Sequence, residues 1–142
     1  AHYARYLVQI GKVSNDGQAF KRYLGGGKSC FVKAEWVDIP TAIETIHAAG
    51  GVAIIAHPMR YNMTGKWIRR LIVDFKQWGG DGMEVADSGQ TKDQRQYLAR
   101  LANEYDLAAS LGSDFHFPCG WIELGKNLFL PEEVKPIWTL FE

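Results

Sequence analysis

From residue 38 to residue 112, the hydrophobic pattern alternates between helical stripes and short, continuous apolar runs. Helical spacing predicts helices over 41–51, 64–79 and 91–105, with Asp38, Thr64 and Thr91 as candidate caps. The runs VAIIA, GMEVA and LAASLG predict three strands, and the first is typical of a strand buried on both faces. Because single helices separate the strands, we expect parallel pairing in a doubly wound sheet or in part of a barrel.

The first 34 residues have a different pattern, with two short helical segments and a glycine-rich stop. Helical spacing predicts one helix from Tyr3 to Ile10, and the segment QAFKRYL predicts a second, which ends at the glycines of GGGK. Residues 29–39 are predicted to be an extended connection or an edge strand. We therefore expect a small helical segment over 1–34 and an α/β part over 35–142, which closes with a short packing helix near PIWTLF.

The composition is that of a folded domain without electrostatic bias. The 142 residues are 46% hydrophobic and 13% aromatic, which is enough material for a core. The formal net charge is zero, so no large nucleic-acid surface and no attraction to an anionic membrane are evident. The run VAIIA is too short to span a bilayer. Two widely spaced cysteines, Cys30 and Cys119, favour a reduced cytoplasmic protein, and a single disulfide stays formally open.

Polar residues with metal-binding chemistry follow each predicted strand. His57 follows the first strand directly, Glu84 and Asp87 lie at or just past the second, and Asp114 and His116 follow the third. The carboxyl ends of parallel strands meet at one rim, where functional groups of α/β proteins collect. Imidazole nitrogen with carboxylate oxygen suits zinc, manganese or iron. We therefore predict that His57, Asp114 and His116 bind a divalent metal.

Asp114 and His116 stand two positions apart in the motif SDFH. In extended backbone their side chains project to one side and Phe115 turns the other way, into the core. The alternative is structural, because a D-x-H pair is common by chance and His57 before Pro58 is also suited to cap a strand end. Their joint position at one rim favours the metal site.

Three cationic residues are candidates for contacts with an anionic substrate. Arg60 lies three residues beyond the first predicted metal ligand, close enough to grip a phosphate with two hydrogen bonds. His2 and Arg5 stand at the start of the chain, and for all three the alternative is a solvated surface charge. His47 is interpreted as a surface histidine. Glu84 is either a carboxylate that orients a metal ligand or a partner in a structural ion pair.

The segments AGGVAIIAHPMRY, GGDGMEV and ASLGSDFH occur in an order that resembles the C-terminal half of the PHP-domain (polymerase and histidinol phosphatase) metallophosphoesterases. In particular, the chain resembles the branch of 3′,5′-nucleotide bisphosphate phosphatases and 5′-3′ exoribonucleases. The opening AHYARYLV, the phrase AFKRYLGGGK and the ending WIELGKNLFLP extend the resemblance over nearly the whole chain.

This resemblance implies a fold, a site and an activity. The fold would be a distorted (β/α)₇ TIM-like barrel with parallel strands, of which 1–34 is an inserted helical segment and 35–142 the C-terminal part. The site would hold divalent ions, manganese first, with zinc or iron as alternatives. The resemblance carries His57, Asp114 and His116 over as metal ligands and His2, Arg5 and Arg60 as substrate contacts. The substrate would be a nucleotide or a short RNA, hydrolysed by attack of a metal-bound hydroxide on phosphorus.

The family's H-x-H motif and its second-motif histidine and glutamate ligands are absent from this chain. We therefore expect the chain alone to be inactive and to need the missing N-terminal part of the barrel as its partner. Two alternatives remain open: a non-catalytic module that binds a partner or nucleic acid with the same fold, and a different metal hydrolase of amidohydrolase type. Substitution of His57 and Asp114 in the intact protein distinguishes the non-catalytic module from the phosphoesterase. A substrate screen distinguishes the amidohydrolase-type enzyme from the phosphoesterase.

Overall fold

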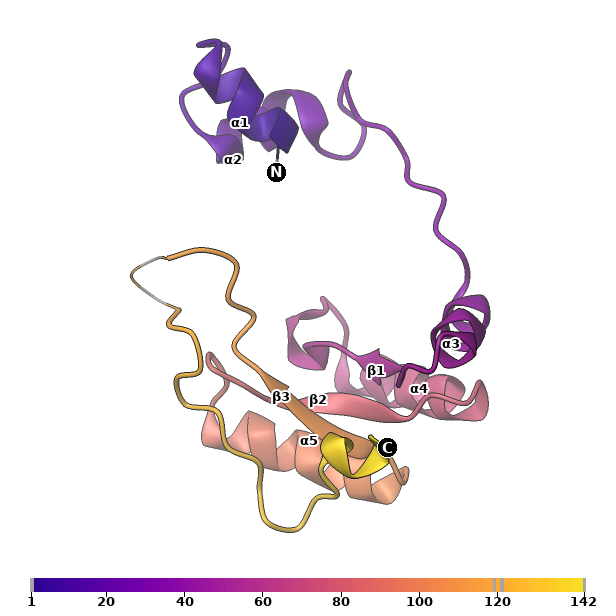
Figure 1. The fold of residues 1–142 in the computed structure, drawn as a ribbon. Helices are drawn as coiled ribbons and strands as arrows, with labels where there is room; N and C mark the ends of the chain where they lie inside the picture. The colour runs from indigo at the N-terminus through magenta and orange to yellow at the C-terminus, as the bar shows by residue number, and fades with distance from the viewer. Residues whose placement is uncertain (1, 119, 121, 142) are drawn as a thin grey trace. The chain divides into compact units, whose positions relative to one another are not determined.

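The computed structural model describes residues 2–118, 120 and 122–141, and the chain divides into two compact units, Ala1–Trp36 and Val37–Glu142 (Figure 1). The first unit contains helix α1 (His2–Gln9), helix α2 (Asp16–Ala19) and a π-helical turn, η1 (Phe20–Leu24). Its small core consists of Ala4, Val13 and Ala19. The two predicted helical segments are thereby confirmed, and the second ends before Gly25.

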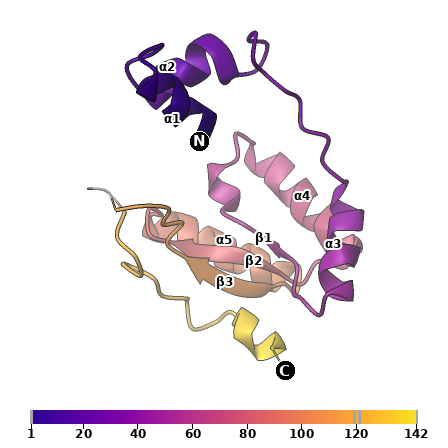
Figure 2. The same ribbon diagram turned by 45° about the horizontal axis from the view of Figure 1, so that its top comes forward.

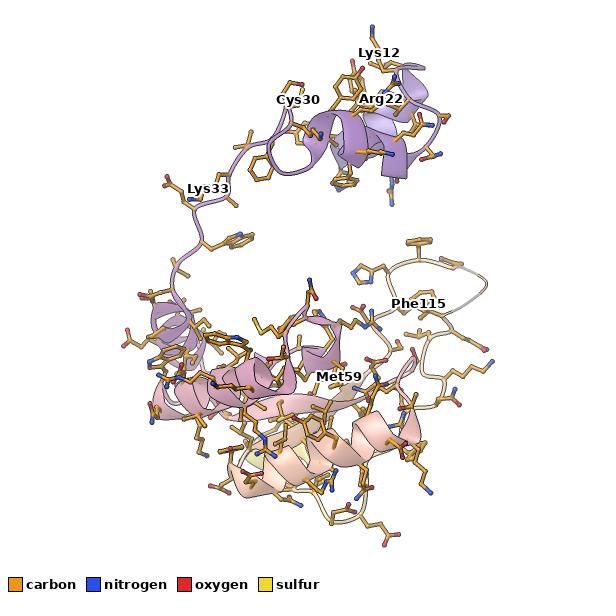
Figure 3. All side chains as sticks on the ribbon, turned by 180° about the vertical axis from the view of Figure 1, so that it is seen from behind. Lys12, Arg22, Cys30, Lys33, Met59 and Phe115 are labelled. Atoms are coloured by element: carbon orange, nitrogen blue, oxygen red, sulfur yellow. The ribbon has the colours of Figure 1, made fainter. Side chains whose placement is uncertain are left out.

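The connection that follows is irregular. Among the described residues, none between 25 and 38 belongs to a strand, so the alternative of an edge strand is wrong. Figure 3 labels Cys30 and Lys33 in this segment. Its apolar side chains Val32 and Trp36 are 85% and 87% exposed. A strand needs a neighbouring strand to hydrogen-bond its backbone groups and a surface to cover its apolar side chains. The described residues provide neither for this segment.

The second unit begins with helix α3 (Ile39–Ala48). Its start follows from Asp38, whose side chain accepts a hydrogen bond from the Thr41 N–H at 2.9 Å, and from Pro40 in the first turn. Helix α5 (Lys92–Glu104) begins with a capping box, in which Thr91 and Gln94 exchange side-chain and backbone hydrogen bonds. These two caps confirm the helix starts predicted from the sequence.

Three parallel strands form the sheet: β1 (Ile54–Ile55), β2 (Gly82–Asp87) and β3 (Ala108–Gly112), in the order β1-β2-β3 (Figure 2). Helix α4 (Gly65–Gln77) connects the first pair and α5 the second. The pairing of β2 with β3 shifts register between Glu84 and Ala86, so Val85 is an extra residue in β2. Parallel pairing through single helices is therefore confirmed.

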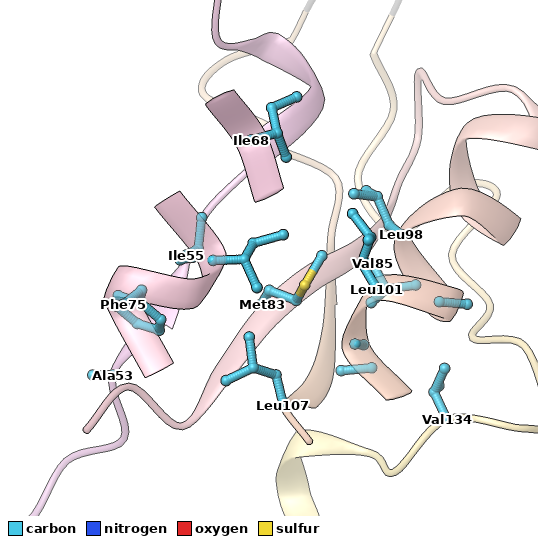
Figure 4. Close-up of a cluster of buried hydrophobic side chains, with 14 of the residues drawn as sticks. Ala53, Ile55, Ile68, Phe75, Met83, Val85, Leu98, Leu101, Leu107 and Val134 are labelled. Atoms are coloured by element: carbon cyan, nitrogen blue, oxygen red, sulfur yellow. The ribbon is translucent and has the colours of Figure 1, made fainter. Parts of the chain in front are cut away.

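The main core lies between one face of the sheet and the helices. Met83 and Val85 of β2 are fully buried and pack in one cluster with Ile68 and Phe75 of α4 and with Leu98 of α5 (Figure 4). With strands in consecutive order, right-handed crossovers place both helices on the same face of the sheet.

The predicted burial of the first strand on both faces is wrong, and Trp67 is a second apolar residue that lies exposed. Ile54 in β1 is 37% exposed, because β1 is an edge strand of the described sheet and only one of its faces is packed. Trp67 fits the helical stripe of α4 but is 63% exposed, since it lies beside the buried face formed by Ile68, Ile72 and Phe75. Thr64 occupies the cap position of α4, but within the described chain its side chain accepts no cap hydrogen bond from a backbone N–H.

The segment after β3 returns along the sheet to a short 3₁₀ turn, η3 (Ile137–Leu140), which matches the predicted closing helix. Ala109 of β3 donates its N–H to the Lys135 carbonyl at 2.7 Å, and Val134 and Ile137 are buried. No helix in the described residues is long and apolar enough to cross a membrane.

His47 has a structural role that the sequence did not indicate. Its Nε2 lies 2.7 Å from Asp81 Oδ2, and the same oxygen accepts the Ala53 N–H at 2.7 Å. His47 is exposed, as interpreted from the sequence, and its imidazole also joins the end of α3 to the amino ends of β1 and β2.

Candidate active site

The carboxyl ends of the three strands bring together residues that are far apart in the sequence. His57 follows β1, Glu84 and Asp87 belong to β2, and Asp114 follows β3. Glu84 Oε2 accepts the backbone N–H of His57 at 2.6 Å, which ties the end of β1 to the middle of β2. The expected rim of polar residues therefore exists in this unit.

Glu84 is one of two buried carboxyls of this rim among the described residues, at 8% exposure. Burial raises its pKa, and the charges of Asp87 and Asp114 raise it further, while the hydrogen bond from His57 lowers it. A Cβ atom at Gly112 would lie 2.7 Å from Glu84 Oε1, so the carboxyl fills space that only glycine leaves. Several carboxyls therefore lie close together, and a bound cation would stabilise their charged forms.

Arg60 supplies one positive charge to these acids. It lies in the short 3₁₀ turn η2 (Pro58–Arg60) that follows His57. Its guanidinium donates to Asp114 Oδ2 and lies 3.6 Å from Asp87 Oδ1. Asp87 is 2% exposed and also accepts the Gly89 N–H at 2.6 Å, so its position is fixed from two sides. Arg60 is therefore exposed to solvent and at the same time paired with carboxylates of the rim.

Two of the predicted metal ligands have left-handed backbone conformations. The φ angle is 34° at His57 and 53° at Asp114. This region costs an ordinary residue roughly 1–2 kcal/mol, and aspartate less than most. Residues in strained conformations gather at functional sites, where the surrounding structure holds them in place. Both residues are held here, His57 by Glu84 and Asp114 by Arg60.

His57 also presents an unpaired ring nitrogen. Its Nδ1 is buried and has no hydrogen-bond partner among the described residues. The imidazole ring packs edge-on against Tyr61, with ring centroids 5.7 Å apart. Burial and the charge of Glu84 raise the pKa of Tyr61. A buried imidazole nitrogen without a partner, beside several carboxyls, has the donor chemistry of a metal ligand.

His116 lies beside Asp114 for a reason other than strand alternation. Strand β3 ends at Gly112, and Asp114 turns left-handed, so the expected extended backbone through SDFH is wrong. The turn brings His116 Nδ1 to 2.8 Å from the Asp114 carbonyl and 3.8 Å from its Oδ1. Phe115 is half-buried in the loop after β3 (Figure 3), where it lines a cavity of about 500 Å³ and not the core.

The described residues do not by themselves form a complete metal site. Within the described residues, no three histidine, cysteine, aspartate or glutamate side chains meet in a geometry that holds one ion. The donor types suit a divalent metal, and the buried His57 Nδ1 lacks a partner, but His57, Asp114 and His116 do not form a closed set. That these three residues are ligands stays a prediction.

His2 and Arg5 belong to the other unit, where both are exposed on α1. Their predicted contact with substrate stays a prediction. Cys119 lies outside the described residues, and Cys30 is a free, exposed thiol.

Arg95 and Gln90 were not singled out in the sequence, although both support this rim. Arg95 is 5% exposed and donates to the Asp87 carbonyl at 3.2 Å and to the Asn127 carbonyl at 3.1 Å. Its guanidinium lies 3.9 Å from the centre of the Phe129 ring. Gln90 accepts the Asp87 N–H at 3.0 Å. The sequence did contain one signal for Arg95, because this arginine occupies a position on the buried helical stripe of α5.

Comparison with known proteins identifies the group to which this rim belongs. Over 99% of its length, the chain is 82% identical to a 5′-3′ exoribonuclease of Haemophilus influenzae and 49% identical to one of Escherichia coli. It is 42% identical to a 3′,5′-nucleoside bisphosphate phosphatase of Chromobacterium violaceum, again over 99% of its length. The chain is homologous to these phosphoesterases. The resemblance inferred from the sequence motifs is therefore confirmed.

The chain spans about half the length of these relatives, with shares of 52%, 48% and 50%. No protein-family profile matches it. Among solved structures it resembles an amidohydrolase from Chromobacterium violaceum with bound sulfate and no metal, at 41% identity and a TM-score of 0.78. It also resembles a protein from Bifidobacterium adolescentis that is assigned as a metal-dependent phosphoesterase, at 26% identity and a TM-score of 0.68. The shares covered are 97% and 93% of this chain, and 48% and 46% of those chains.

Proposed function

We propose that the whole protein carrying this chain is a divalent-metal-dependent phosphoesterase that hydrolyses nucleotides or short RNA, as a 3′,5′-bisphosphate phosphatase or a 5′-3′ exonuclease. The carrying observation is the rim, where a strained histidine, three carboxyls and an arginine converge at the carboxyl ends of parallel strands. The names of its homologues support the same reaction. We also propose that the protein works in the cytoplasm.

The barrel is part of this proposal. Helices α4 and α5 cover one face of the sheet, while Glu84 projects from the other, next to Gly112. In a barrel the uncovered face would be the interior and the rim would be its mouth. The edge of β1, with Ile54 partly exposed, would then pair with a strand from the remainder of the protein.

The residues of this chain divide the work between metal and substrate. His57, Asp114 and His116 would hold a divalent ion together with ligands from outside this chain, with manganese as our first choice and zinc or iron as alternatives. Such an ion lowers the pKa of a bound water and neutralises charge on a phosphoryl group. Glu84 would fix the orientation of His57 through the backbone N–H.

Arg60 would serve the phosphate. In this structure its guanidinium pairs with Asp114. If Asp114 bound a metal, the Arg60 guanidinium would be free to donate two parallel hydrogen bonds to phosphate oxygens. Sulfate has the shape of phosphate, and a protein 41% identical to this chain binds it. His2 and Arg5 would add further contacts from the helical segment.

The test compares two aspartates in the whole protein. Asp114→Asn removes the charge of the predicted ligand, and Asp106→Asn makes the same change at an exposed residue that is also left-handed. We expect Asp114→Asn to weaken manganese binding and to lower phosphate release from nucleoside 3′,5′-bisphosphates and 5′-phosphorylated RNA by about 100-fold. Asp106→Asn should change neither. Calorimetry measures manganese binding, and a phosphate-release assay measures the rate of hydrolysis.

Three outcomes would refute the proposal. A manganese-loaded protein that releases neither phosphate nor mononucleotide would exclude a nucleotide phosphoesterase, and hydrolysis of amides instead would assign it to the amidohydrolases. If His57→Ala and Asp114→Asn left the protein's function intact, the non-catalytic module would be the better account.

A further inference from the structure

Charge is divided unequally between the two units of the chain. Residues 1–36 contain six lysines and arginines and two acidic residues, which gives a formal charge of +4. Residues 37–142 contain ten lysines and arginines and 14 acidic residues, which gives −4. The zero net charge of the chain is therefore the sum of a basic helical unit and an acidic α/β unit. A local excess of cations attracts a polyanion even where the whole chain has no net charge.

The cations of the first unit are exposed and have no carboxylate partners. All six are exposed, and none forms an ion pair within the part of the chain that the structure describes. They are Arg5, Lys12, Lys21, Arg22, Lys28 and Lys33. In the second unit, by contrast, five of the ten cations are paired with carboxylates. The positive charge of the first unit is therefore available to an external anion.

Three of these cations lie at one end of a helical turn. Lys21 and Arg22 belong to the last turn of η1. Cys30 donates its N–H to the Tyr23 carbonyl at 3.0 Å, so the chain folds back and the intervening Lys28 stays close to the same end. Figure 3 labels Arg22 and Cys30 on this unit. Cations at the carboxyl end of a helix also stabilise the helix, which is the structural alternative for these three residues.

Aromatic rings are exposed on the same unit. Tyr3 and Tyr6 of α1 are 78% and 57% exposed, and Phe20 of η1 is 46% exposed. Tyr3 and Tyr6 are three positions apart in a helix, so their rings lie on one face of α1. Ala4 of α1 and Ala19, which precedes Phe20, share one small core, so α1 and the start of η1 are neighbours. The unit therefore presents exposed rings and unpaired cations together.

This combination describes one kind of ligand. Proteins that bind single-stranded nucleic acids combine cations that contact the phosphates with aromatic rings on which the bases stack. Cations alone would suit any polyanion. The rings favour a single strand, because the faces of the bases in a double helix are already stacked on one another.

We propose that the first unit binds single-stranded RNA, through the nucleotides beyond the one that is hydrolysed. Lys21, Arg22 and Lys28 bind backbone phosphates. The rings of Tyr3 and Tyr6 stack on bases. This inference rests on the proposed function and adds a surface that takes no part in breaking the ester. With this surface, the protein would bind an RNA strand more tightly than a single nucleotide.

The first test removes charge from the whole protein at two places. The cationic variant changes three residues of the first unit: Lys21→Gln, Arg22→Gln and Lys28→Gln. The matched control removes three charges from exposed residues of the second unit that form no ion pair in the described chain: Lys92→Gln, Arg100→Gln and Lys135→Gln. The two variants have the same net charge, so a difference between them reports on position.

A second variant concerns the rings. Tyr3→Leu combined with Tyr6→Leu removes both rings but keeps apolar side chains with a high helix propensity. His2 and Arg5 stay unchanged in every variant, because the proposed function assigns them to the nucleotide that reacts. Thermal unfolding by circular dichroism establishes that each variant is folded.

Fluorescence anisotropy measures binding to a labelled, 5′-phosphorylated RNA of about 12 nucleotides, a length that single-strand-binding folds occupy. Metal is left out, so that no hydrolysis occurs, and potassium chloride is varied from about 50 to 200 mM. The slope of log affinity against log salt should become shallower by about 2 in the cationic variant, since each contact to a single strand contributes about 0.7. The control should keep the slope and the affinity of the unaltered protein.

The ring variant should behave differently from the cationic variant. Its affinity for RNA should fall by about tenfold, which corresponds to about 1.4 kcal/mol, because stacking on the bases is lost. Its salt slope should not change, since no phosphate contact is removed. With manganese added, both variants should raise KM for the RNA and leave KM and kcat for a nucleoside 3′,5′-bisphosphate unchanged.

Several results would overturn the inference. If the control weakened RNA binding as much as the cationic variant, only net charge would matter. If the cationic variant bound RNA normally but unfolded at a lower temperature, its three cations would serve only the helix end. Normal RNA binding by the ring variant would exclude stacking on Tyr3 and Tyr6. Binding to phosphatidylglycerol vesicles and not to RNA would assign the unit to a membrane surface.

The unaltered protein provides a test that needs no variant. Three phosphate contacts require a salt slope of about −2 or steeper, and a shallower slope would refute the inference. Failure here is distinguishable from failure of the proposed function, because binding is measured without metal. RNA binding that depends on the three cations, in a protein that hydrolyses no nucleotide, would refute the proposed function and leave this surface in place. Hydrolysis of bisphosphates with equal RNA binding by all variants would do the reverse.

Discussion

Replacement of Arg95 by methionine should loosen the C-terminal loop from the end of β2. Arg95 lies on α5 at 5% exposure and donates two hydrogen bonds, to the Asp87 and Asn127 carbonyls. The Phe129 ring packs against its guanidinium at 3.9 Å. One side chain therefore joins a helix, a strand end and the loop that follows β3.

The magnitude follows from these contacts. Hydrogen bonds from a charged donor contribute about 1.5–3 kcal/mol each, and a cation over an aromatic ring about 0.5–2 kcal/mol. Burial of the cation opposes this gain, as the lowered pKa of Arg95 indicates, with burial as its main cause. Methionine fills a similar volume without a charge. We expect a net loss of about 2–4 kcal/mol in the free energy of unfolding, the range for a broken buried network.

The assay is urea unfolding of the whole protein, combined with amide hydrogen exchange across residues 122–136. Arg100→Met is the matched control, because Arg100 is exposed on the same helix. The control should change stability by less than about 0.5 kcal/mol. The reasoning fails if Arg95→Met lowers the free energy of unfolding by no more than the control does, or if amide hydrogen exchange in residues 122–136 is not faster in the variant.

Two further predictions concern Glu84. Gly112→Ala should displace the Glu84 carboxyl, because the new Cβ would lie 2.7 Å from Glu84 Oε1. The rate of hydrolysis should then fall although the protein stays folded. Gly120→Ala is the control, because a Cβ at Gly120 has open space around it, and this variant should have no effect. Glu84→Gln keeps an acceptor for His57 and removes the charge. Since the folded pKa is raised above 4.5, wild-type stability falls as pH rises from that value through the folded pKa. In metal-free urea unfolding, the free energy of unfolding of Glu84→Gln relative to the wild type should therefore increase over that pH range. A difference that does not change with pH would contradict a raised pKa of Glu84.

Much of the fold was predictable because local signals and packing agree. Caps at Asp38 and Thr91 mark helix starts through bonds that involve neighbouring residues only, and both formed as expected. Burial was predicted less well, because it depends on what covers a surface. The apolar run VAIIA reads as a buried strand, yet Ile54 is partly exposed where no second strand is described beyond β1. Likewise, Trp67 is apolar at a helical spacing but lies outside the contact.

The site was predicted in outline and not in detail. The rule that strand ends share a rim brought His57, Glu84 and Asp114 to one place, which the structure bears out. Pairing of Arg60 with Asp114 could not be read from the sequence, because it joins residues 54 positions apart through loops of unknown course. The left-handed turn at Asp114 was also hidden, since aspartate is common in extended backbone as well.

The clearest limit of pattern reasoning is the register of β2. Strict alternation would place Glu84 and Asp87, three positions apart, on opposite faces of the sheet. The shift between Glu84 and Ala86 inserts Val85 as one extra residue, which restores Asp87 to the side on which its charge raises the pKa of Glu84. Val85 meanwhile stays fully buried with Met83. A single bulge thus satisfies the core and gathers the carboxyls, and a strand of the same composition without it would present Asp87 to the helices, away from Arg60.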